Sequence, residues 1–562
     1  MFSALSFLLA LAASAASPRL ASIAIPGTPD FVAVARDVLD ARIALDPNVA
    51  SGSGLFDDAV RVPSFSPEAV KTLTERMDRD LAALGKMPWR SWDVDRQVDW
   101  RWVYANAEDV RRQVAVERLY RRRPSAWLEP LAENLISLTT YAPERADLRA
   151  RIVALIPAMV AEMRRVAREA TVRDVKTADG VAQGILTILK SELPGPERDA
   201  ARSALTAYLD ELKQLPADIP EFTVIGADLY AGRLKDVGLS PWEPRQLLAL
   251  AQRELAEVDA SLAALSTQAA PAPTSEQTAL AKSLDQRKLL GLYDAIAQAD
   301  RGFLEASSIL TVPAGVGPIH ARPTPDAMIP LTGDGGSMNP PPPFGASNVG
   351  WWNVEHFKDD WSEAKRLEMV LEASNQKTTG MGPYAVHEGV PGHHLQLSIA
   401  RLNANPLRSI LWDNALVEGW ALYAEDVFWR AGGLGPSPEA RRQTLESWRF
   451  RIRRVFYDVN VESGDWTLQD AADFKSGALR GTGKVDEDIL RTVNWPAQLV
   501  GYFSGKMQLL ALREAYRKKL GPAYTDRAFH DALLAEGSVP VALIRAKLLG
   551  EPVPGTDRPK PD

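Results

Sequence analysis

Cysteine is absent from this sequence of 562 residues. Its absence excludes disulfide bonds, thiolate ligands to a metal ion and a cysteine nucleophile. It also argues against a lipid anchor on a cysteine side chain. Any metal site in the chain must therefore use nitrogen and oxygen ligands.

Long apolar runs and a large excess of one charge are also missing. After the first twenty residues, no uninterrupted apolar stretch reaches the roughly 18 residues that a membrane span needs, so we expect no stable membrane insertion of the mature protein. The net charge of −7 is modest for this length, and no clustered basic field predicts a nucleic-acid partner. No P-loop, dinucleotide-binding fingerprint or G-x-S-x-G nucleophile motif occurs.

The first twenty residues form the one apolar exception. Small residues follow an apolar run there, and Ala13-Ser14-Ala15 offers an A-x-A cleavage site. This pattern predicts a secretory signal peptide over residues 1–17, which would place the mature protein in the periplasm or outside the cell. Because no lysine or arginine precedes the apolar run, an N-terminal apolar arm is the alternative.

Helical periodicity runs through most of the chain. Apolar residues recur at three- and four-residue spacing, for instance across 64–87, 104–123, 128–170, 242–265 and 275–309. The proline-rich residues 268–273 predict a turn between two long antiparallel helices. The expected fold is therefore mostly α.

The main irregular stretch covers residues 311–352 and contains four consecutive prolines and several glycines. It predicts loop and short strand, as a functional rim or as a surface excursion. We place a boundary there, between an N-terminal helical region over 18–320 and a C-terminal helical region over 321–553 that carries the chemistry. Residues 554–562 are expected to form a disordered tail.

Three of the six histidines lie within eight residues, namely His387, His393 and His394, beside Glu388. Such a cluster favours a metal site over isolated core or surface histidines. In the familiar H-E-x-x-H motif the two imidazoles are one helical turn apart, but here position 391 is proline, followed by glycine. On an unbroken helix His387 and His393 would lie about 120° apart around the axis. Because the proline and glycine break the helix, we predict a kink or bulge that lets these two histidines converge on one zinc ion.

A third ligand is expected from a second helix, and Glu418 is the best candidate. It lies 25 residues after His393, a gap that fits a turn and an antiparallel helix. Two histidines and one carboxylate leave a fourth position for water, which is typical of catalytic zinc. Glu388 would then be the general base for the zinc-activated water. Glu425, two turns further on, is either an outer partner of the site or an ordinary salt-bridged glutamate.

At these residues the sequence resembles the bacterial family named domain of unknown function 885, which is placed among the gluzincin-type metallopeptidases. Residues 387–396 fit its pattern H-E-G-x-P-G-H-H-x-Q, and residues 418–425 fit E-G-W-A-L-Y-A-E. The resemblance is clear over 345–550 and weaker before. It implies a large multi-helix, metallopeptidase-like body with a cleft and a small β or loop element, distantly similar to thimet oligopeptidase and angiotensin-converting enzyme. Those relatives place the glutamate ligand at the same separation from the second histidine, which favours His393 over His394.

Two further blocks resemble the family. Arg454 with Asp458 resembles R-L-V-V-D-T-G-L-H, and Arg491 with residues 496–498 and 502–505 resembles R-Y-x-x-x-P-G-Q-A-x-x-Y-K-x-G. By this resemblance Tyr502 is the first choice for the donor to the developing oxyanion, and Arg454 is the second. A packed tyrosine, and an arginine in a buried ion pair with Asp458, are the alternatives.

The chain departs from the family pattern at three positions. Glu462 replaces a histidine that the family would bring near the cleft, and Ala497 and Phe503 replace a glycine and a lysine. These changes bear on substrate preference or transition-state contacts, since the expected metal ligands are intact.

The expected function is zinc-dependent hydrolysis of peptide bonds, in oligopeptides rather than folded proteins. The expected metal ligands are His387, His393 and Glu418, and the expected catalytic residues are Glu388, Tyr502 and Arg454. Two alternatives stay open. One is a zinc hydrolase of another amide or an ester, and the other is a non-catalytic metal-binding or scaffold protein. The sequence gives no indication of the oligomeric state.

Overall fold

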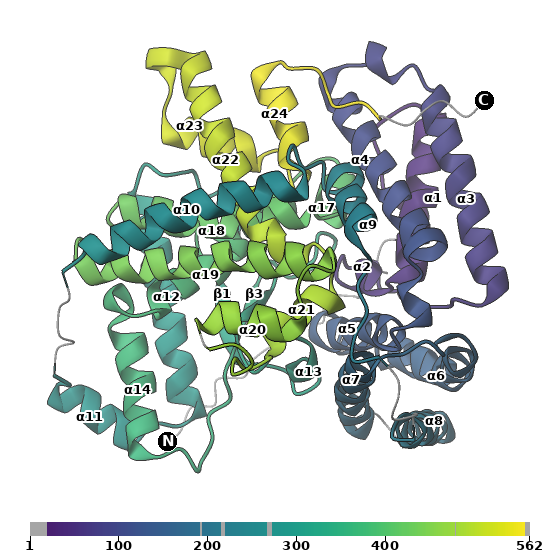
Figure 1. Cartoon of the computed structure of the whole chain (residues 1–562), viewed down its shortest axis with the longest axis horizontal. Helices are drawn as coiled ribbons and strands as arrows, with labels where there is room; N and C mark the ends of the chain where they lie inside the picture. Colours follow the sequence, from purple (N-terminus) through teal and green to yellow (C-terminus); the bar gives the residue numbers. More distant parts are fainter. Residues whose placement is uncertain (1–18, 192–193, 215–219, 267–271, 478, 557–562) are drawn as a thin grey trace, which may run out of the picture.

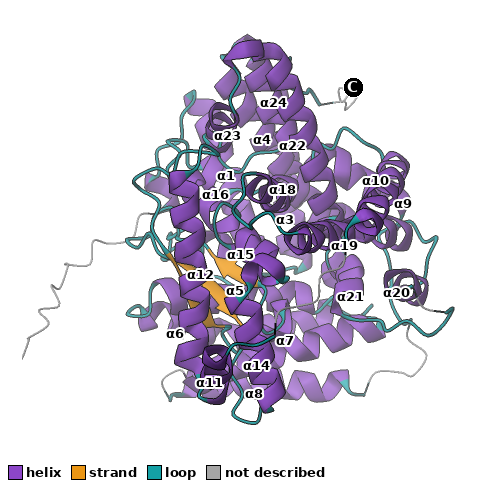
Figure 2. Cartoon of the chain, turned by 90° about the vertical axis from the view of Figure 1, so that its left-hand side faces the viewer, coloured by secondary structure: helices purple, strands orange, loops and turns teal. Residues whose placement is uncertain are grey.

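A computed structural model describes residues 19–191, 194–214, 220–266, 272–477 and 479–556. These residues are mostly helical, as the periodicity predicts, and they include one small three-stranded sheet (Figures 1 and 2). The predicted signal peptide lies outside the described residues. So do residues 557–562 of the predicted tail, whereas 554–556 are described and carry no helix or strand. Among the described helices, none has the length and apolar character that a membrane crossing requires.

Three of the N-terminal helices, α1 (Pro29–Leu45), α3 (Pro67–Lys86) and α4 (Val94–Arg111), begin after a residue whose side chain caps them. Thr28, Ser66 and Asp93 each accept a hydrogen bond from a backbone N–H of the first turn of α1, α3 and α4, which satisfies a donor that the helix itself cannot pair. The predicted stretch 128–170 is divided between two helices, α5 and α6. The helices are α1 (Pro29–Leu45), α2 (Asn48–Ser51), α3 (Pro67–Lys86), α4 (Val94–Arg111), α5 (Ser125–Tyr141), α6 (Ala146–Val166), α7 (Val172–Ser191), α8 (Pro196–Leu212) and α9 (Ala227–Gly232).

The middle of the chain differs in one respect from the prediction. The proline-rich residues follow the long helix α10 (Pro244–Ala264), but the next helix, α11 (Ser275–Lys282), is short, and the long α12 (Gln286–Ala306) begins only afterwards. Asp285 separates the two because its side chain caps α12 by accepting from the backbone N–H of Lys288. Residues 267–271 of the turn itself lie outside the described part.

The irregular stretch contains the small sheet that the sequence predicts. Its strands are β1 (Ile319–Pro323), β2 (Ser337–Asn339) and β3 (Gly350–Val354), with the short helix α13 (Ile329–Thr332) between β1 and β2. The central strand β3 pairs in parallel with β1 and antiparallel with β2, so that Trp352 lies opposite both Ala321 and Met338. Trp352 is 1% exposed, and its ring meets that of Tyr293 on α12 edge to face. This tryptophan is therefore part of the core.

The C-terminal helices contain the histidine cluster. They are α14 (Glu363–Ser374), α15 (Met381–Glu388), α16 (His393–Ala400), α17 (Leu407–Ile410), α18 (Asn414–Arg430), α19 (Pro438–Glu462), α20 (Leu468–Ser476), α21 (Glu487–Asn494), α22 (Gln498–Leu520), α23 (Asp526–Leu534) and α24 (Val541–Leu549). Short 3-10 segments lie at Leu20–Ser22, Trp89–Ser91, Leu119–Arg121, Gln376–Thr378 and Gly521–Ala523, and π-helical segments continue α4 (Arg112–Glu117) and α9 (Arg233–Val237).

The helix α18 is buried on most of its faces and packs very closely against α22. Glycines make this contact possible, since a Cβ atom on Gly505 would lie 1.7 Å from the carbonyl oxygen of Ala415, and one on Gly419 would lie 2.5 Å from the backbone of Gly505. Small residues at such a crossing let two backbones approach. The approach brings Glu418 on α18 next to the first turn of α22.

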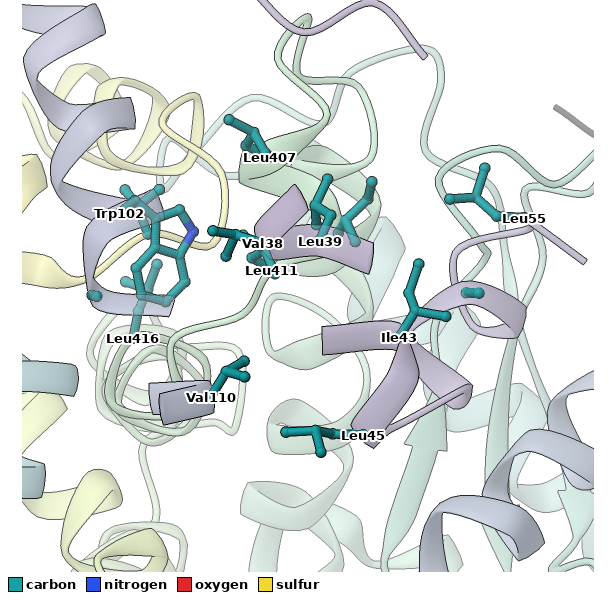
Figure 3. Close-up of a cluster of buried hydrophobic side chains, with 14 of the residues drawn as sticks. Val38, Leu39, Ile43, Leu45, Leu55, Trp102, Val110, Leu407, Leu411 and Leu416 are labelled. Atoms are coloured by element: carbon teal, nitrogen blue, oxygen red, sulfur yellow. The ribbon is translucent and has the colours of Figure 1, made fainter. Parts of the chain in front are cut away.

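One hydrophobic cluster joins the two regions predicted from the sequence. Figure 3 shows Val38 and Leu39 of α1 and Trp102 of α4 together with Leu411 and Leu416 from the second region. Strand β1 also crosses the predicted boundary at residue 320. The division of the chain at that point stays a prediction, but the two parts share a core.

Candidate metal centre

The helix that carries the histidine cluster is broken where the sequence predicts a break. Helix α15 ends at Glu388 and α16 begins at His393, with a cis peptide bond between Val390 and Pro391. The indole N–H of Trp420 on α18 donates to the carbonyl oxygen of Pro391 at 2.8 Å. The connecting residues are therefore held against the helix that carries Glu418.

Glycine at position 392 is required by this geometry. Its backbone N–H donates to the carbonyl oxygen of Val386 at 3.0 Å. A Cβ atom there would lie 2.1 Å from the carbonyl oxygens of both Val386 and His387. Any larger residue would force the two halves of the motif apart.

The three predicted metal ligands converge. The Nε2 atoms of His387 and His393 lie 3.6 and 3.3 Å from Oε2 of Glu418, and the two imidazole rings are 4.7 Å apart between centroids. With bonds of about 2.1 Å, the atoms of a tetrahedral zinc site are separated by about 3.4 Å along each edge. Oε2 of Glu418 has no hydrogen-bond donor among the described residues, so a cation would satisfy it. The residues present therefore fit a zinc ion.

Glu388 is the second carboxylate near the imidazoles. One atom of Glu388 and one atom of each histidine lie within 4.8 Å of one another. Both carboxylates therefore lie close enough to take part in a metal site, Glu418 by its distances to the two Nε2 atoms and Glu388 by this limit. The assignment of Glu418 as the ligand and of Glu388 as the general base stays a prediction from the sequence.

His394 points away from this site. Its Nε2 atom lies 3.0 Å from the carbonyl oxygen of Gly317, and it must donate there because a carbonyl can only accept. The ring is fully buried against Gly350, where a Cβ atom would lie 2.3 Å from Nδ1. Burial lowers the pKa of His394 to about 4, so the ring is neutral at physiological pH. Of the two candidates for the second histidine, His393 faces the site.

Other side chains hold the predicted ligands in position. The Nδ1 atom of His387 lies 2.9 Å from Oε1 of Glu425, which leaves the Nε2 lone pair for a metal. Nε2 of Gln498, in the first turn of α22, lies 3.5 Å from Oε1 of Glu418. Arg491 donates to the side-chain oxygen of Gln498 at 2.7 Å and thereby fixes its amide orientation. The sequence left two roles open for Glu425, and its contact with His387 favours that of an outer partner of the site.

The electrostatics of the cluster favour a bound cation. Burial alone would lower the pKa of His387, but the carboxylates of Glu418 and Glu425 outweigh it and raise the pKa to about 10. Burial would raise the pKa of Glu418, but the two histidines hold it well below its usual value. Without a metal the site therefore holds a proton on His387, and a metal ion must displace that proton.

A cavity of about 880 Å³ lies beside these residues. Its walls include His387, Glu388, His393 and Glu418, and Gly336, Ser337, Met338 and Pro340 from the irregular stretch also line it. Part of this stretch is therefore a rim of the cavity rather than only a surface excursion. A volume of this size is typical of pockets for small ligands and short peptides.

Tyr502 and Arg454 both line this cavity. The ring of Tyr502 stacks nearly parallel to that of His387 at 6.2 Å, and its hydroxyl lies 3.4 Å from Nη2 of Arg491. The guanidinium of Arg454 lies over the Tyr502 ring, 4.7 Å from its centroid. Its Nη2 atom donates to Asp488 at 2.6 Å, while Nε and Nη1 have no partner among the described residues.

The alternative ion pair between Arg454 and Asp458 is wrong. Asp458 instead accepts from the hydroxyl of Tyr230 and from the backbone N–H of Val500, both at 3.0 Å. Burial raises the pKa of Asp458 to about 8. The acid that pairs with Arg454 is Asp488 of α21, which the sequence analysis missed.

The comparison with known proteins agrees with the sequence motifs. The chain matches the family described as "Bacterial protein of unknown function (DUF885)" over residues 47–548. The chain belongs to this family. No curated protein matches it. A solved structure of a presumed lipoprotein of unknown function from Shewanella oneidensis has a TM-score of 0.70 and 18% identity, covering 93% of this chain and 100% of the other. A presumed lipoprotein from Colwellia psychrerythraea has a TM-score of 0.69 and 18% identity, covering 92% and 98%. At this identity the likeness concerns the fold.

The three positions where this member departs from the DUF885 pattern do not line the 880 Å³ cavity. Glu462 is fully buried at the end of α19, where it accepts from the backbone N–H of Ile225 at 3.0 Å. It is not among the residues that line the 880 Å³ cavity, which corrects the expectation that position 462 faces the cleft. Phe503 is buried in a stack with Trp448. Ala497 has φ of +68°, a conformation that explains why the family pattern has glycine there.

Several residues at or next to the cavity were not predicted as part of the site. Trp412, just before α18, and Asn414, its first residue, line the cavity. Gln498 does not line it but reaches Glu418 from α22. Gln498 belongs to the family pattern, so a signal for it was present. Trp412 is 47% exposed, which is unusual for a tryptophan and marks a wall of a cavity rather than core.

Proposed function

We propose that this protein is a zinc-dependent hydrolase of peptide bonds that acts on oligopeptides. The observation that carries the proposal is the approach of His387, His393 and Glu418 at separations close to the edge of a tetrahedral zinc site. Glu388 lies beside them, and a cavity of about 880 Å³ gives access. This donor set leaves a coordination position free for water or substrate, as in catalytic rather than structural zinc sites.

The roles of the surrounding side chains follow from their positions. A bound zinc ion would supply Lewis-acid chemistry, which acidifies a water molecule and polarises a carbonyl group. Glu388 would take the proton released as the water attacks the carbonyl carbon, and would pass it to the leaving amine. Glu425 would hold His387 in the tautomer that presents Nε2, and Gln498 would orient Glu418.

Tyr502 and Arg454 are the proposed donors to the developing negative charge. Both line the cavity, and Tyr502 stacks beside His387. The unpartnered Nε and Nη1 of Arg454 can donate without breaking the pair with Asp488. Donors already aimed at the charge that develops in a transition state are among the largest contributions to catalysis. We propose Tyr502 as the main donor because its hydroxyl carries one proton that it can give.

The resemblance of the motifs to gluzincin-type peptidases supports the choice of peptide bonds. A substrate that enters an interior cavity of this size is a short peptide rather than a folded protein. We also propose that the protein works in the periplasm or outside the cell. Residues 1–17 have the pattern of a signal peptide, and two structural neighbours are described as presumed lipoproteins.

The test compares wild type with Glu388→Gln, His387→Ala and the control Glu363→Gln at an exposed position. Bound zinc is measured in each purified protein, and cleavage is followed with a peptide library. We expect Glu388→Gln to keep zinc and lose cleavage by about a thousandfold, and the control to keep both. Zinc bound by wild type without cleavage of any peptide would overturn the proposal, in favour of another amide or ester substrate or of a scaffold. Undiminished zinc in His387→Ala would overturn the ligand assignment.

A further inference from the structure

A second cavity, the inner chamber, adjoins the cavity of the metal centre. It has a volume of about 500 Å³. The two cavities share the lining residues Glu129, Trp412, Asn414, Asn494 and Trp495. Gln498 also lines the inner chamber, and its Nε2 atom lies 3.5 Å from Glu418. The chamber therefore begins one side chain away from a predicted metal ligand.

Four carboxyl groups that line the inner chamber form no ion pair within 4.0 Å among the described residues. They are Asp46 at the end of α1, Glu129 and Glu133 on α5, and Asp413 at the start of α18. Each accepts a hydrogen bond from a neutral donor, such as the side-chain amide of Asn48 at 3.2 Å from Glu133. No ion pair within 4.0 Å joins any of the four to a lysine or arginine in the part of the chain that the structure describes.

The arginines that line the same chamber are already paired. Arg42, Arg123 and Arg233 form ion pairs with Asp109, Asp174 and Glu117 respectively. Their charges are matched by these acids, and Arg233 also pairs with Asp109. The wall of the chamber therefore carries an unmatched excess of carboxyl groups.

A separate observation also points to a ligand. The side chain of Trp102 lines the chamber and is 3% exposed, yet its indole N–H has no acceptor among the described residues. Figure 3 shows this ring beside Leu416, with which it shares the hydrophobic cluster. A buried indole N–H usually has a hydrogen-bond partner, because an unmade bond costs free energy. A carbonyl oxygen of a ligand in the chamber would supply that partner.

We propose that the inner chamber binds an alkylammonium group of the peptide substrate, either its amino terminus or a lysine side chain, among the carboxylates of Asp46, Glu129 and Glu133. This rests on the proposed function for the nature of the substrate. A peptide places a carbonyl group close to its terminal ammonium, so a single residue can satisfy both the acids and Trp102. The chamber would then fix the distance between the cationic group and the bond that is cleaved.

The titration of these acids is consistent with a cationic ligand. Burial raises the pKa of Glu129 to about 7 and of Glu133 to about 8, and that of Asp413 to about 7. Arg42 and Arg123 are the cations that face these groups. A bound ammonium would favour the ionised carboxylates, so binding would release protons. Affinity for the cationic group should therefore rise between pH 6 and pH 8.

The test measures binding without turnover, by titration calorimetry on the zinc-loaded Glu388→Gln protein and on metal-free wild type. The probes are tetra-alanine with a free amino terminus, its N-acetyl form, and N-acetyl peptides that begin with lysine or with norleucine. We expect the charged peptides to bind at least about tenfold more tightly than their neutral counterparts. If only the peptide with a free amino terminus binds more tightly than its neutral counterpart, or only the peptide with lysine does, the result identifies which ammonium group the chamber binds. Equal affinity for charged and neutral peptides would overturn the proposal.

The variants are matched in chemistry. Glu129→Gln combined with Glu133→Gln should abolish the preference for charge, whereas Glu144→Gln, at an exposed position just after α5, should keep it. Trp102→Phe should lower the affinity for all the peptides and retain the preference for the charged ones. An unchanged preference in the double variant would refute the assignment, with folding checked by circular dichroism. Because these readouts need no cleavage, a failure of the proposed peptidase activity would leave them interpretable. If wild type cleaves charged and neutral peptides equally well, the proposal for the inner chamber is refuted, whereas the proposed peptidase activity is not.

Discussion

Replacing Glu133 by glutamine should stabilise the protein at pH 8 and change its stability little at pH 5. Burial, together with the neighbouring carboxylates of Asp46 and Glu129, raises the pKa of Glu133 from 4.5 to about 8. Below about pH 4.5 both the folded and the unfolded state hold the proton, so the carboxyl group does not weaken the fold there. As the pH rises toward 8, the unfolded state has lost its proton while the folded state still holds it, and stability falls.

The magnitude follows from this difference in pKa. Each unit corresponds to about 1.4 kcal/mol, so the change from 4.5 to about 8 amounts to roughly 4 kcal/mol at pH 8. Glutamine has almost the same shape, carries no charge and can still accept from Asn48. Since Asp46 shares the electrostatic penalty and remains in the variant, we expect about half of this amount, roughly 2 kcal/mol, to be recovered.

Urea unfolding followed by circular dichroism at pH 5 and pH 8 measures the effect. The midpoint of Glu133→Gln should move to higher urea at pH 8 and stay near that of wild type at pH 5, where the expected gain is below about 1 kcal/mol. The control Glu144→Gln, at an exposed position, should match wild type at both pH values. If the difference in stability between the variant and wild type is the same at both pH values, or if the variant is less stable than wild type at pH 8, Glu133 is ionised or paired in the folded protein.

Three further predictions concern the candidate metal centre and the residues around it. Glu425→Gln should lower the affinity for zinc by roughly tenfold to a hundredfold, because Glu425 fixes the tautomer of His387; unchanged affinity in competition with a chelator would contradict this role. The zinc affinity of wild type should rise about tenfold per pH unit from pH 6 to 8, since zinc must displace the proton on His387, whose pKa is about 10; a flat profile would contradict it. Ala497→Gly should raise the free energy of unfolding by about 0.5–1 kcal/mol, because alanine is strained at φ of +68°; a loss of stability would show that the methyl group contributes more than the strain costs.

The convergence of the candidate ligands could be predicted because these residues lie close together in the sequence. His387 and Glu388 lie on α15, His393 on α16, and Glu418 and Glu425 on α18. Helical spacing relates residues on one helix, and the proline and glycine identify the point where that relation breaks. The mostly helical fold was likewise predictable from periodicity, and the strands from the change of composition after residue 311.

The resemblance favours His393 over His394, and the structure gives the physical reason. Adjacent residues at the start of a helix point about 100° apart, so the direction of α16 decides which of them meets Glu418. That direction depends on the contacts of the connection with Trp420 and on the close approach at Gly392. The contact with Trp420 joins residues 29 positions apart, so helical spacing within the motif alone does not give the direction of α16.

The partner of Arg454 illustrates a second limit. Asp458 lies one turn away on α19, which is the spacing that favours a pair on a helix. Tyr230 and Val500, from two other helical segments, take that carboxylate instead. The guanidinium is left to face α21, where it finds Asp488. Short-range patterns identify possible partners, but competition from distant segments selects among them.

The acids of the inner chamber can be compared with buried acids elsewhere in the described part of the chain. Asp99 and Glu536 are both nearly buried, and both bind the guanidinium of Arg408, at 2.7 and 2.6 Å. Other buried acids have no ion pair among the described residues, since Asp458 and Glu462 accept from backbone N–H groups instead. Glu129 and Glu133 likewise have no ion pair among the described residues, although keeping them unpaired costs stability. What distinguishes Glu129 and Glu133 from Asp458 and Glu462 is their place in the wall of a cavity that adjoins the candidate metal centre. That position is the reason for proposing the ammonium group of a substrate as their partner.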